Sequence, residues 1–221
     1  MLIRFICLII GYVFGLFQTS YLYGRLHGID IREYGSGNAG TTNALRTLGK
    51  KAGAITFLGD CFKCIFAAVF IYLIFHNSYG DMIKLLQVYG ACGVILGHNF
   101  PFYLKFKGGK GIAATAGMIC SINWLMTVFA FFTFVIAYGL TNYVSVGSLM
   151  IYVGFMIEVV IFGQMGVFHL SQAHLNEMYI IAAFLTILAF WKHRQNIKRL
   201  MEGTENKTYL LKKQEKEKKD E

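Results

Sequence analysis

The sequence predicts an all-α polytopic membrane protein with about seven transmembrane helices. Of its 221 residues, 56% are hydrophobic and 16% are aromatic, and there is one proline. Hydrophobic runs recur along the chain, and most reach the roughly 20 residues that span a bilayer core. They lie at 2–23, 52–75, 85–104, 112–139, 143–168 and 176–191. A soluble domain of this size has no core large enough to bury all of them.

Basic residues predict how the runs are oriented. Of the 21 Lys and Arg residues, five lie in 25–51, three in 103–111 and ten in 192–221. The positive-inside rule places these three regions in the cytoplasm. An even number of spans must therefore separate the second region from the third, so the run 112–139 has to be split. We place the split near Ser121-Ile122-Asn123, which predicts seven spans with the N-terminus outside and the C-terminus cytoplasmic; a re-entrant first half is the alternative.

Two domains of unequal size follow from this pattern. Residues 1–201 are predicted to form the membrane domain, and residues 202–221 a charged, solvated and disordered cytoplasmic tail. The cysteines lie in or beside apolar runs and are interpreted as buried, unpaired thiols. They are Cys7, Cys61, Cys64, Cys92 and Cys120. No set of side chains suggests a metal site or a resident cofactor.

The polar stretch 97–111 predicts an anion site at the membrane surface. Its glycines let the backbone approach an anion closely, its lysines supply charge, and a helix starting near Ile112 would add its positive dipole end. Phosphate is the favoured anion. The stretch is not a nucleotide P-loop, because Gly111 stands where that motif needs Ser or Thr. The lone proline, Pro101, is expected to end the third span.

A second oxyanion site is predicted in the loop 23–49. Glycines permit an irregular backbone there, and Thr41 or Thr42 is suited to cap a short helix that Gly49 ends. On that helix Thr42 and Arg46 are i,i+4 neighbours, so a hydroxyl and a guanidinium share a face. The alternative is a connector whose glycines only make turns.

Further polar residues interrupt or end the apolar runs. Asp60 and Lys63 lie one helical turn apart, and an ion pair or a role in the site are both open. His193 and Asn196 share a helix face at the end of the last span. The pair His76-x4-Asp81 has acyltransferase-like spacing but is predicted in an outer loop, so we interpret it as chance.

Four elements are predicted at the inner face: the loop 23–49, the stretch 97–111, the polar break Thr141-Asn142-Tyr143-Val144-Ser145 and the end of the last span. Together they predict a site that binds anions next to lipid. No carboxylate pair or nucleophile triad accompanies them. Transfer between a lipid-soluble group and a water-soluble phosphate compound fits this composition, and nothing indicates a nucleic-acid partner.

These residues carry a resemblance to a known family. Three sequence groups are involved: Gly35-Ser36-Gly37-Asn38 with Gly40-Thr41-Thr42-Asn43 and Arg46; Gly97-His98-Asn99-Phe100-Pro101 with Phe106-Lys107-Gly108-Gly109-Lys110-Gly111; and His193-Arg194-x-Asn196. The combination is similar to the bacterial acyl-phosphate:glycerol-3-phosphate acyltransferases known as PlsY, over about residues 8–205.

The resemblance implies a seven-span enzyme of the bacterial inner membrane with its site on the cytoplasmic face. The implied reaction in phospholipid biosynthesis transfers a fatty acyl group from acyl phosphate to the 1-hydroxyl of sn-glycerol 3-phosphate. Lysophosphatidic acid and phosphate are the implied products. Matched positions imply that the acyl phosphate contacts Ser36, Asn38, Thr42, Asn43 and Arg46. They imply that glycerol 3-phosphate contacts Lys107, Ser145, His193 and Asn196, with Lys107 able to touch both phosphates.

The residues leave several points open. Gly108, Gly109 and Lys110 are expected to bind phosphate, and the proton acceptor is the leaving phosphate, His98 or His193. Departures from the family pattern occur at Thr41, Cys64 and Gln195 and at Phe17-Gln18-Thr19-Ser20, which has no proline. A transporter for a phosphorylated solute is the alternative function, and an inactive regulator of lipid synthesis is a third possibility.

Overall fold

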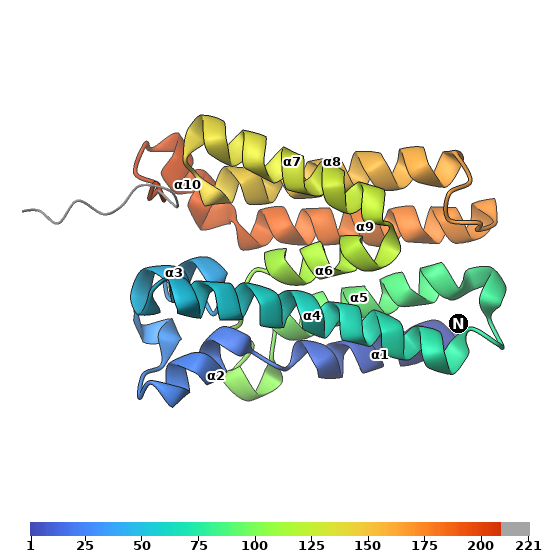
Figure 1. Ribbon diagram of the computed structural model, residues 1–221, viewed down its shortest axis with the longest axis horizontal. Coiled ribbons are helices and arrows are strands. Elements are labelled where there is room, and N and C mark those ends of the chain that lie inside the picture. Colours follow the sequence, from blue (N-terminus) through green and yellow to red (C-terminus); the bar gives the residue numbers. More distant parts are fainter. Residues whose placement is uncertain (209–221) are drawn as a thin grey trace, which may run out of the picture.

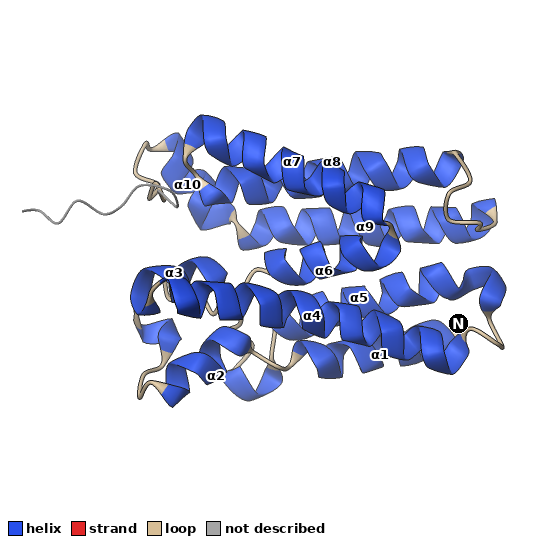
Figure 2. Cartoon of the chain, viewed as in Figure 1, coloured by secondary structure: helices blue, strands red, loops and turns tan. Residues whose placement is uncertain are grey.

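The computed structural model describes residues 1–208, which fold into helices and loops without a strand in that range (Figure 2). The α-helices in chain order are α1 (Leu2–Gly15), α2 (Thr19–Leu26), α3 (Thr41–Leu48), α4 (Lys50–Phe75), α5 (Ile83–Asn99), α6 (Ile112–Ile122), α7 (Trp124–Thr141), α8 (Val144–Gln164), α9 (Gln172–Lys192) and α10 (Arg194–Met201). Short 3₁₀ helices are η1 (Ile31–Glu33), η2 (Gly80–Met82) and η3 (Phe102–Leu104). The expected all-α class is confirmed.

Five helical segments of the described chain are long and apolar enough to cross a membrane. They are Leu2–Leu26, Lys50–Phe75, Trp124–Thr141, Val144–Gln164 and Gln172–Lys192. One further apolar helix is shorter, α6 with 11 residues. Helix α5, with 17 residues, lies in the predicted third span 85–104 but is not among the candidate spans of the described chain. Large apolar side chains on the long helices face outward, as with Phe131 at 61% and Ile187 at 71% exposure. Such a surface suits lipid, and the fold is that of a multi-pass membrane protein.

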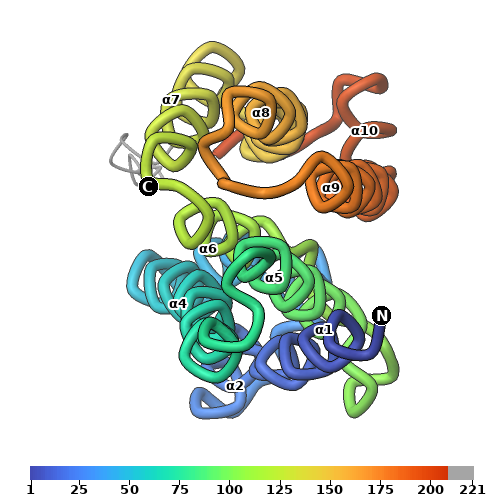
Figure 3. Tube along the Cα trace, turned by 90° about the vertical axis from the view of Figure 1, so that its right-hand side faces the viewer, coloured from blue at the N-terminus to red at the C-terminus, as the bar shows by residue number. Residues whose placement is uncertain are grey.

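The long helices form two groups that run side by side (Figures 1 and 3). Helices α1, α4 and α5 make one group, with α2 and α3 at one end of it, and α7, α8 and α9 make the other. Helix α6 lies between the groups and packs on α4, α5 and α7. The short helices α2, α3 and α10 gather at the same end of the bundle (Figure 1), and this is the end that carries the site.

Glycines allow the closest helix contact, between α1 and α5. A Cβ atom on Gly11 would lie 1.8 Å from the carbonyl oxygen of Gly90, and one on Gly93 would lie 2.1 Å from that of Leu8. Small residues at such positions let two helix backbones touch, which is how helices associate where lipid removes the hydrophobic driving force. The contact therefore sets the position of α5 along α1. The C-terminal end of α5 leads into the site.

Several sequence predictions are confirmed at the level of elements. The break in 112–139 is present, because Asn123 ends α6 and its side-chain oxygen caps α7 by accepting from the amides of Leu125 and Met126. Helix α3 spans Thr41–Leu48 and ends at Gly49, whose φ of 88° favours glycine. Helix α5 ends at Asn99, just before Pro101.

The predicted first span 2–23 corresponds to the candidate span Leu2–Leu26, which contains a local break between α1 and α2. Gln18 has an extended backbone with φ −98° and ψ 90°. Its buried side-chain amide donates to the carbonyl oxygens of Gly15, Gly97 and His98 at 3.1 to 3.3 Å. A glutamine that satisfies carbonyls of two helices thus makes a break without a proline.

Candidate active site

Asn43 organises the first glycine-rich loop from helix α3. Its buried side chain donates to the carbonyl oxygens of Ile31 and Tyr34 at 2.9 and 3.0 Å and accepts from the amide of Ser36 at 2.9 Å. Gly35 has a φ of +59°, and a Cβ there would lie 2.3 Å from the Asn43 side-chain oxygen. Asn43, predicted as a substrate ligand, therefore uses its polar atoms to shape the loop.

The other predicted groups of this loop face a large cavity. Ser36, Asn38 and Thr42 line it, and their side chains have no hydrogen-bond partner within residues 1–208. They remain available to a ligand. Arg46 also lines the cavity, but its guanidinium donates to Thr208 Oγ1 at 2.7 Å and to the carbonyl oxygen of Asn206 at 3.3 Å.

Gly108 and Gly109 in the second loop act by close packing. Their amides donate to the carbonyl oxygens of Asn99 and His98 at 3.3 and 3.0 Å, so they cap the end of α5. These amides were predicted to bind phosphate, but in this structure they are occupied by the helix end. A Cβ at Gly108 would lie 2.0 Å from the His98 carbonyl oxygen. Glycine is needed here because the loop lies directly on the helix end.

Lys110 joins this loop to helix α10. Its ammonium donates to the side-chain oxygen of Asn196 and lines the cavity. Burial, together with Arg199, Lys192 and Arg46 nearby, lowers the pKa of Lys110 to about 8, although Glu205 opposes the shift. The Lys110 ammonium therefore gives up its proton near pH 8.

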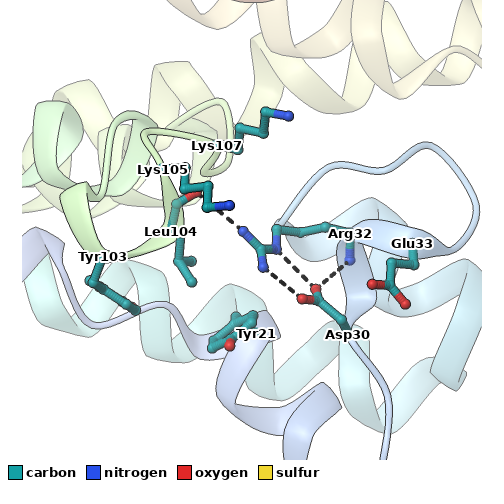
Figure 4. A pocket seen from close by; sticks show the side chains of 8 residues that line it. All are labelled: Tyr21, Asp30, Arg32, Glu33, Tyr103, Leu104, Lys105 and Lys107. Carbon is teal, nitrogen blue, oxygen red and sulfur yellow. Dashed lines mark hydrogen bonds and ion pairs between the residues drawn. The ribbon is translucent and has the colours of Figure 1, made fainter.

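Lys107 does not line the large cavity in this structure. It is exposed and borders a smaller pocket of about 360 Å³, where it points away from the ion pair of Arg32 and Asp30 (Figure 4). That pair is held by contacts of 2.6 to 3.0 Å, and the Arg32 guanidinium lowers the pKa of Asp30. Lys105 also lines the small pocket.

Glu205 holds together the third part of the site. Its carboxylate accepts from Ser145 Oγ at 3.1 Å, from Asn196 Nδ2 at 2.7 Å and from Arg199 Nε at 2.7 Å. Burial alone would raise the pKa of Glu205, but these hydrogen bonds outweigh it and the net shift is downward. Sequence reasoning placed Glu205 in the tail. In the part of that tail that the structure describes, residues 202–208, Glu205 and Asn206 line the cavity; the residues from 209 onward lie outside the described part of the chain.

His193 is placed to accept a proton. It is 2% exposed and lines the cavity, and its Nδ1 lies 2.8 Å from the carbonyl oxygen of Ala189. A carbonyl can only accept, so Nδ1 carries the hydrogen and Nε2 keeps its lone pair. Burial and the charge of Lys110 lower the pKa of His193 to about 4, so the imidazole is neutral at pH 7.

Asp60, Lys63 and His98 form a buried network beside these loops. The Lys63 ammonium donates to Asp60 Oδ1 at 2.8 Å and contacts His98 Nδ1 at 2.9 Å. Asp60 and His98 also line the large cavity. The ion pair that the sequence left as one alternative is therefore present, and a direct role of Asp60 in the site stays a prediction.

The large cavity combines two chemically different ends. It has a volume of about 990 Å³, and its polar part is built from the two loops, the start of α8 and the α9–α10 junction. Its apolar part is lined by membrane helices through Phe57, Ile112, Ala116, Ile119, Ala130, Phe131, Phe134 and Ile151. Lys110, Lys192, Arg46, Arg194 and Arg199 give the polar part a surplus of positive charge. Such a cavity suits an amphiphile with an anionic head and an apolar tail. Within residues 1–208 no cluster of side chains could hold a metal ion.

Fold and site together define a multi-pass helical membrane protein with a cationic cavity at one end of the bundle. The family model described as glycerol-3-phosphate acyltransferase matches residues 5–203. The chain belongs to this glycerol-3-phosphate acyltransferase family.

Proteins that are similar to this chain in sequence or in structure carry the same description. A glycerol-3-phosphate acyltransferase of Clostridioides difficile (strain 630) is 40% identical over 200 residues, which cover 90% of this chain and 92% of that protein. One of Thermoanaerobacter sp. (strain X514) is 38% identical with the same coverage. A crystal structure of PlsY (YgiH), an integral membrane glycerol 3-phosphate acyltransferase in its glycerol 3-phosphate form, superposes with a TM-score of 0.80 at 28% identity, covering 93% of this chain and 96% of that one. Its lysophosphatidic acid form gives a TM-score of 0.78 at 27% identity, covering 93% and 95%.

Proposed function

We propose that this chain transfers a fatty acyl group from an acyl phosphate to the 1-hydroxyl of sn-glycerol 3-phosphate. The products are lysophosphatidic acid and inorganic phosphate, and the step serves phospholipid biosynthesis. The observation that carries the proposal is the single cavity in which a cationic end adjoins an apolar end. Family membership and the glycerol 3-phosphate and lysophosphatidic acid forms of the solved neighbour support the acceptor and the product.

The reaction needs orientation and charge stabilisation rather than a protein nucleophile. The hydroxyl oxygen forms a bond to the acyl carbon, and the bond from that carbon to the phosphate oxygen breaks, with the electron pair leaving on phosphate. Ser36, Asn38 and Thr42 offer open hydrogen-bonding groups, and Arg46 and Lys110 offer positive charge. Positioning and preorganised electrostatics supply most of the rate when the donor is already activated.

The hydroxyl proton has two acceptors in this scheme. The leaving phosphate can take it directly. His193 can take it at Nε2, because its Nδ1–H is held by the Ala189 carbonyl. Both routes balance, because His193 then passes its proton to the leaving phosphate and hydrogen phosphate is released in each.

The membrane arrangement belongs to the same proposal. Seven spans, an N-terminus outside and a site on the cytoplasmic face of the bacterial inner membrane follow from the distribution of Lys and Arg. Lys107 is proposed to bind both phosphates, which requires its exposed side chain to turn from the small pocket towards the cavity.

The test uses purified protein in detergent or a lipid mesophase. Palmitoyl phosphate with glycerol 3-phosphate should release phosphate and form lysophosphatidic acid, whereas palmitoyl-CoA should not serve as donor. No turnover, with a known homologue active under the same conditions, would refute the enzyme. Uptake of labelled glycerol 3-phosphate into proteoliposomes without an acyl donor would instead support the transporter alternative.

A further inference from the structure

His98 occupies the point where the two glycine-rich loops meet. It is 3% exposed and stands near the end of α5. A Cβ on Gly109 would lie 2.0 Å from His98 Nε2 and 2.6 Å from the carbonyl oxygen of Ala39. The Nε2 edge of the ring therefore faces Gly109 of the second loop and Ala39 of the first.

The other ring nitrogen of His98 is an acceptor. Lys63 Nζ lies 2.9 Å from His98 Nδ1, 2.8 Å from Asp60 Oδ1 and 2.7 Å from the carbonyl oxygen of Phe17. Lys63 forms an ion pair with the Asp60 carboxylate, so its nitrogen is an ammonium with three hydrogens and no lone pair. All three hydrogens are used, and the third must be accepted by Nδ1.

Asp60 keeps this ammonium in place. Its Oδ1 also accepts from Thr19 Oγ1 at 3.0 Å, and the side chains of Asp60 and Lys63 are 2% and 5% exposed. Buried hydrogen-bond networks of this kind are rigid. The neutral tautomer of His98 with its hydrogen on Nε2 is thereby imposed by the protein.

This Nε2–H has no hydrogen-bond partner within residues 1–208. His98 nevertheless lines the large cavity, together with Asn38 and Lys110 from the two loops. The Nε2 atom is not among the buried side-chain atoms that lack a partner in the described chain, so it is accessible from the cavity. A ligand oxygen in the cavity can therefore accept its hydrogen bond.

We propose that His98 is a fixed, neutral hydrogen-bond donor that presents Nε2–H to an anionic oxygen of the bound acyl phosphate, and that Lys63 is the positioning residue that sets its tautomer. The proposal rests on the proposed function for the identity of the ligand. It removes His98 from the possible proton acceptors, because its only lone pair on nitrogen is already bound by Lys63. His193 has the opposite arrangement, with Nδ1–H donating and Nε2 open.

Two substitutions of similar size separate the donor role from a base or a purely structural role. His98→Gln places an amide N–H near the position of Nε2 and gives up the acceptor for Lys63. His98→Asn keeps a polar atom near the position of Nδ1 and gives up the donor into the cavity. We expect His98→Asn to lower kcat/KM for the acyl phosphate about 100-fold, the effect of removing one oxyanion donor, and His98→Gln to stay within about tenfold of the parent.

Controls on each variant are the thermal midpoint and the KM for glycerol 3-phosphate. Equal losses of activity in both variants would overturn the donor role and favour a base. If the loss of activity in each variant matches the fall in its thermal midpoint, the donor role would be overturned in favour of a structural role. Unchanged activity in both would also overturn it.

The role of Lys63 is tested by a double-mutant cycle. Lys63→Met should lower kcat/KM strongly in the parent, where the imidazole can then change tautomer, and much less in the His98→Gln background, where an amide cannot. Asp60 loses its partner in both backgrounds, so the cost to folding is common. Additive effects would overturn the positioning role.

One measurement does not depend on the reaction. Nitrogen-15 spectra of histidine-labelled protein should show a protonated Nε2 for His98 and a protonated Nδ1 for His193. The reverse tautomer at His98 would overturn the inference even if the enzyme is active. If the parent shows no turnover but the His98 tautomer is as described, the proposed function fails while the network stands.

Discussion

Lys110 donates its ammonium to the side-chain oxygen of Asn196, across 86 positions of the chain. Asn196 in turn donates through its nitrogen to Glu205. One amide thus joins the second glycine-rich loop to the end of the described chain. The polar end of the cavity is complete only when these three parts of the sequence are in place, which explains why no single motif defines the site.

The pKa of Lys110 leads to a prediction about alkaline pH. Burial lowers this pKa to about 8, so the free protein loses the positive charge as the pH rises through that value. The charged form is the one that binds phosphate, and kcat/KM for glycerol 3-phosphate should therefore fall above about pH 8. Lys110→Arg keeps its charge at every pH used, so its kcat/KM should not fall above about pH 8. If kcat/KM of Lys110→Arg falls in the same pH range as that of the parent, a group other than Lys110 titrates.

Lys107 gives a test of the site that does not disturb the fold. The side chain is exposed and has no partner within residues 1–208, so Lys107→Ala should leave the thermal midpoint unchanged. Turnover should nevertheless be nearly abolished if the ammonium turns inward to bind phosphate.

Two controls accompany that variant. Lys105→Ala removes a neighbouring exposed lysine of the same loop, and His76→Ala removes the histidine that follows α4 at its end remote from α3. Both should keep turnover. If His76→Ala were inactive and Lys107→Ala active, the site would lie at the other end of the bundle.

The sequence predicted features that depend on short-range chemistry. Asn123 as a helix break, the short helix ended by Gly49 and the end of α5 before Pro101 all follow from local backbone preferences. The residues brought to the cavity were also mostly those expected, because polar side chains beside apolar runs have few other places to go.

What the sequence did not reveal depends on long-range contacts. The break at Gln18 requires carbonyls of α5, which are about 80 positions away, and the tautomer of His98 requires Lys63. Glu205 resembled the rest of a charged tail. The one signal was its place as an acid just after Gly203, whose φ is +69°, next to the basic end of α10. Lys107 was grouped with Lys110 by proximity, although a loop can send neighbouring side chains to different pockets.

The contact between α1 and α5 predicts a strong effect of one methyl group. Gly11→Ala would place a Cβ 1.8 Å from the Gly90 carbonyl oxygen, which is backbone and cannot move aside. The helices must separate, and overpacking of this kind costs about 1–3 kcal/mol. The free energy of unfolding, measured by denaturing-detergent titration, should fall by that amount. Gly139→Ala in α7, where a Cβ has nothing within 4 Å, is the control and should be neutral or slightly stabilising.

Glu205 predicts a coupling between stability and substrate binding. Glu205→Gln keeps the size of the side chain but removes the charge that Arg199 and Asn196 face. Hydrogen bonds to a charged group contribute about 1.5–3 kcal/mol, so the substitution should lower the free energy of unfolding by that amount. Asn196 also loses a fixed orientation, and with it the oxygen offered to Lys110, so KM for glycerol 3-phosphate should rise. Glu202→Gln is the matched control, because Glu202 is half-exposed and its ion pair with Lys198, at 3.8 Å, is worth little. A higher KM in Glu205→Gln without loss of stability would assign Glu205 to substrate binding alone. Equal effects in Glu205→Gln and Glu202→Gln would show that the loss of a negative charge matters, and not the contacts of Glu205.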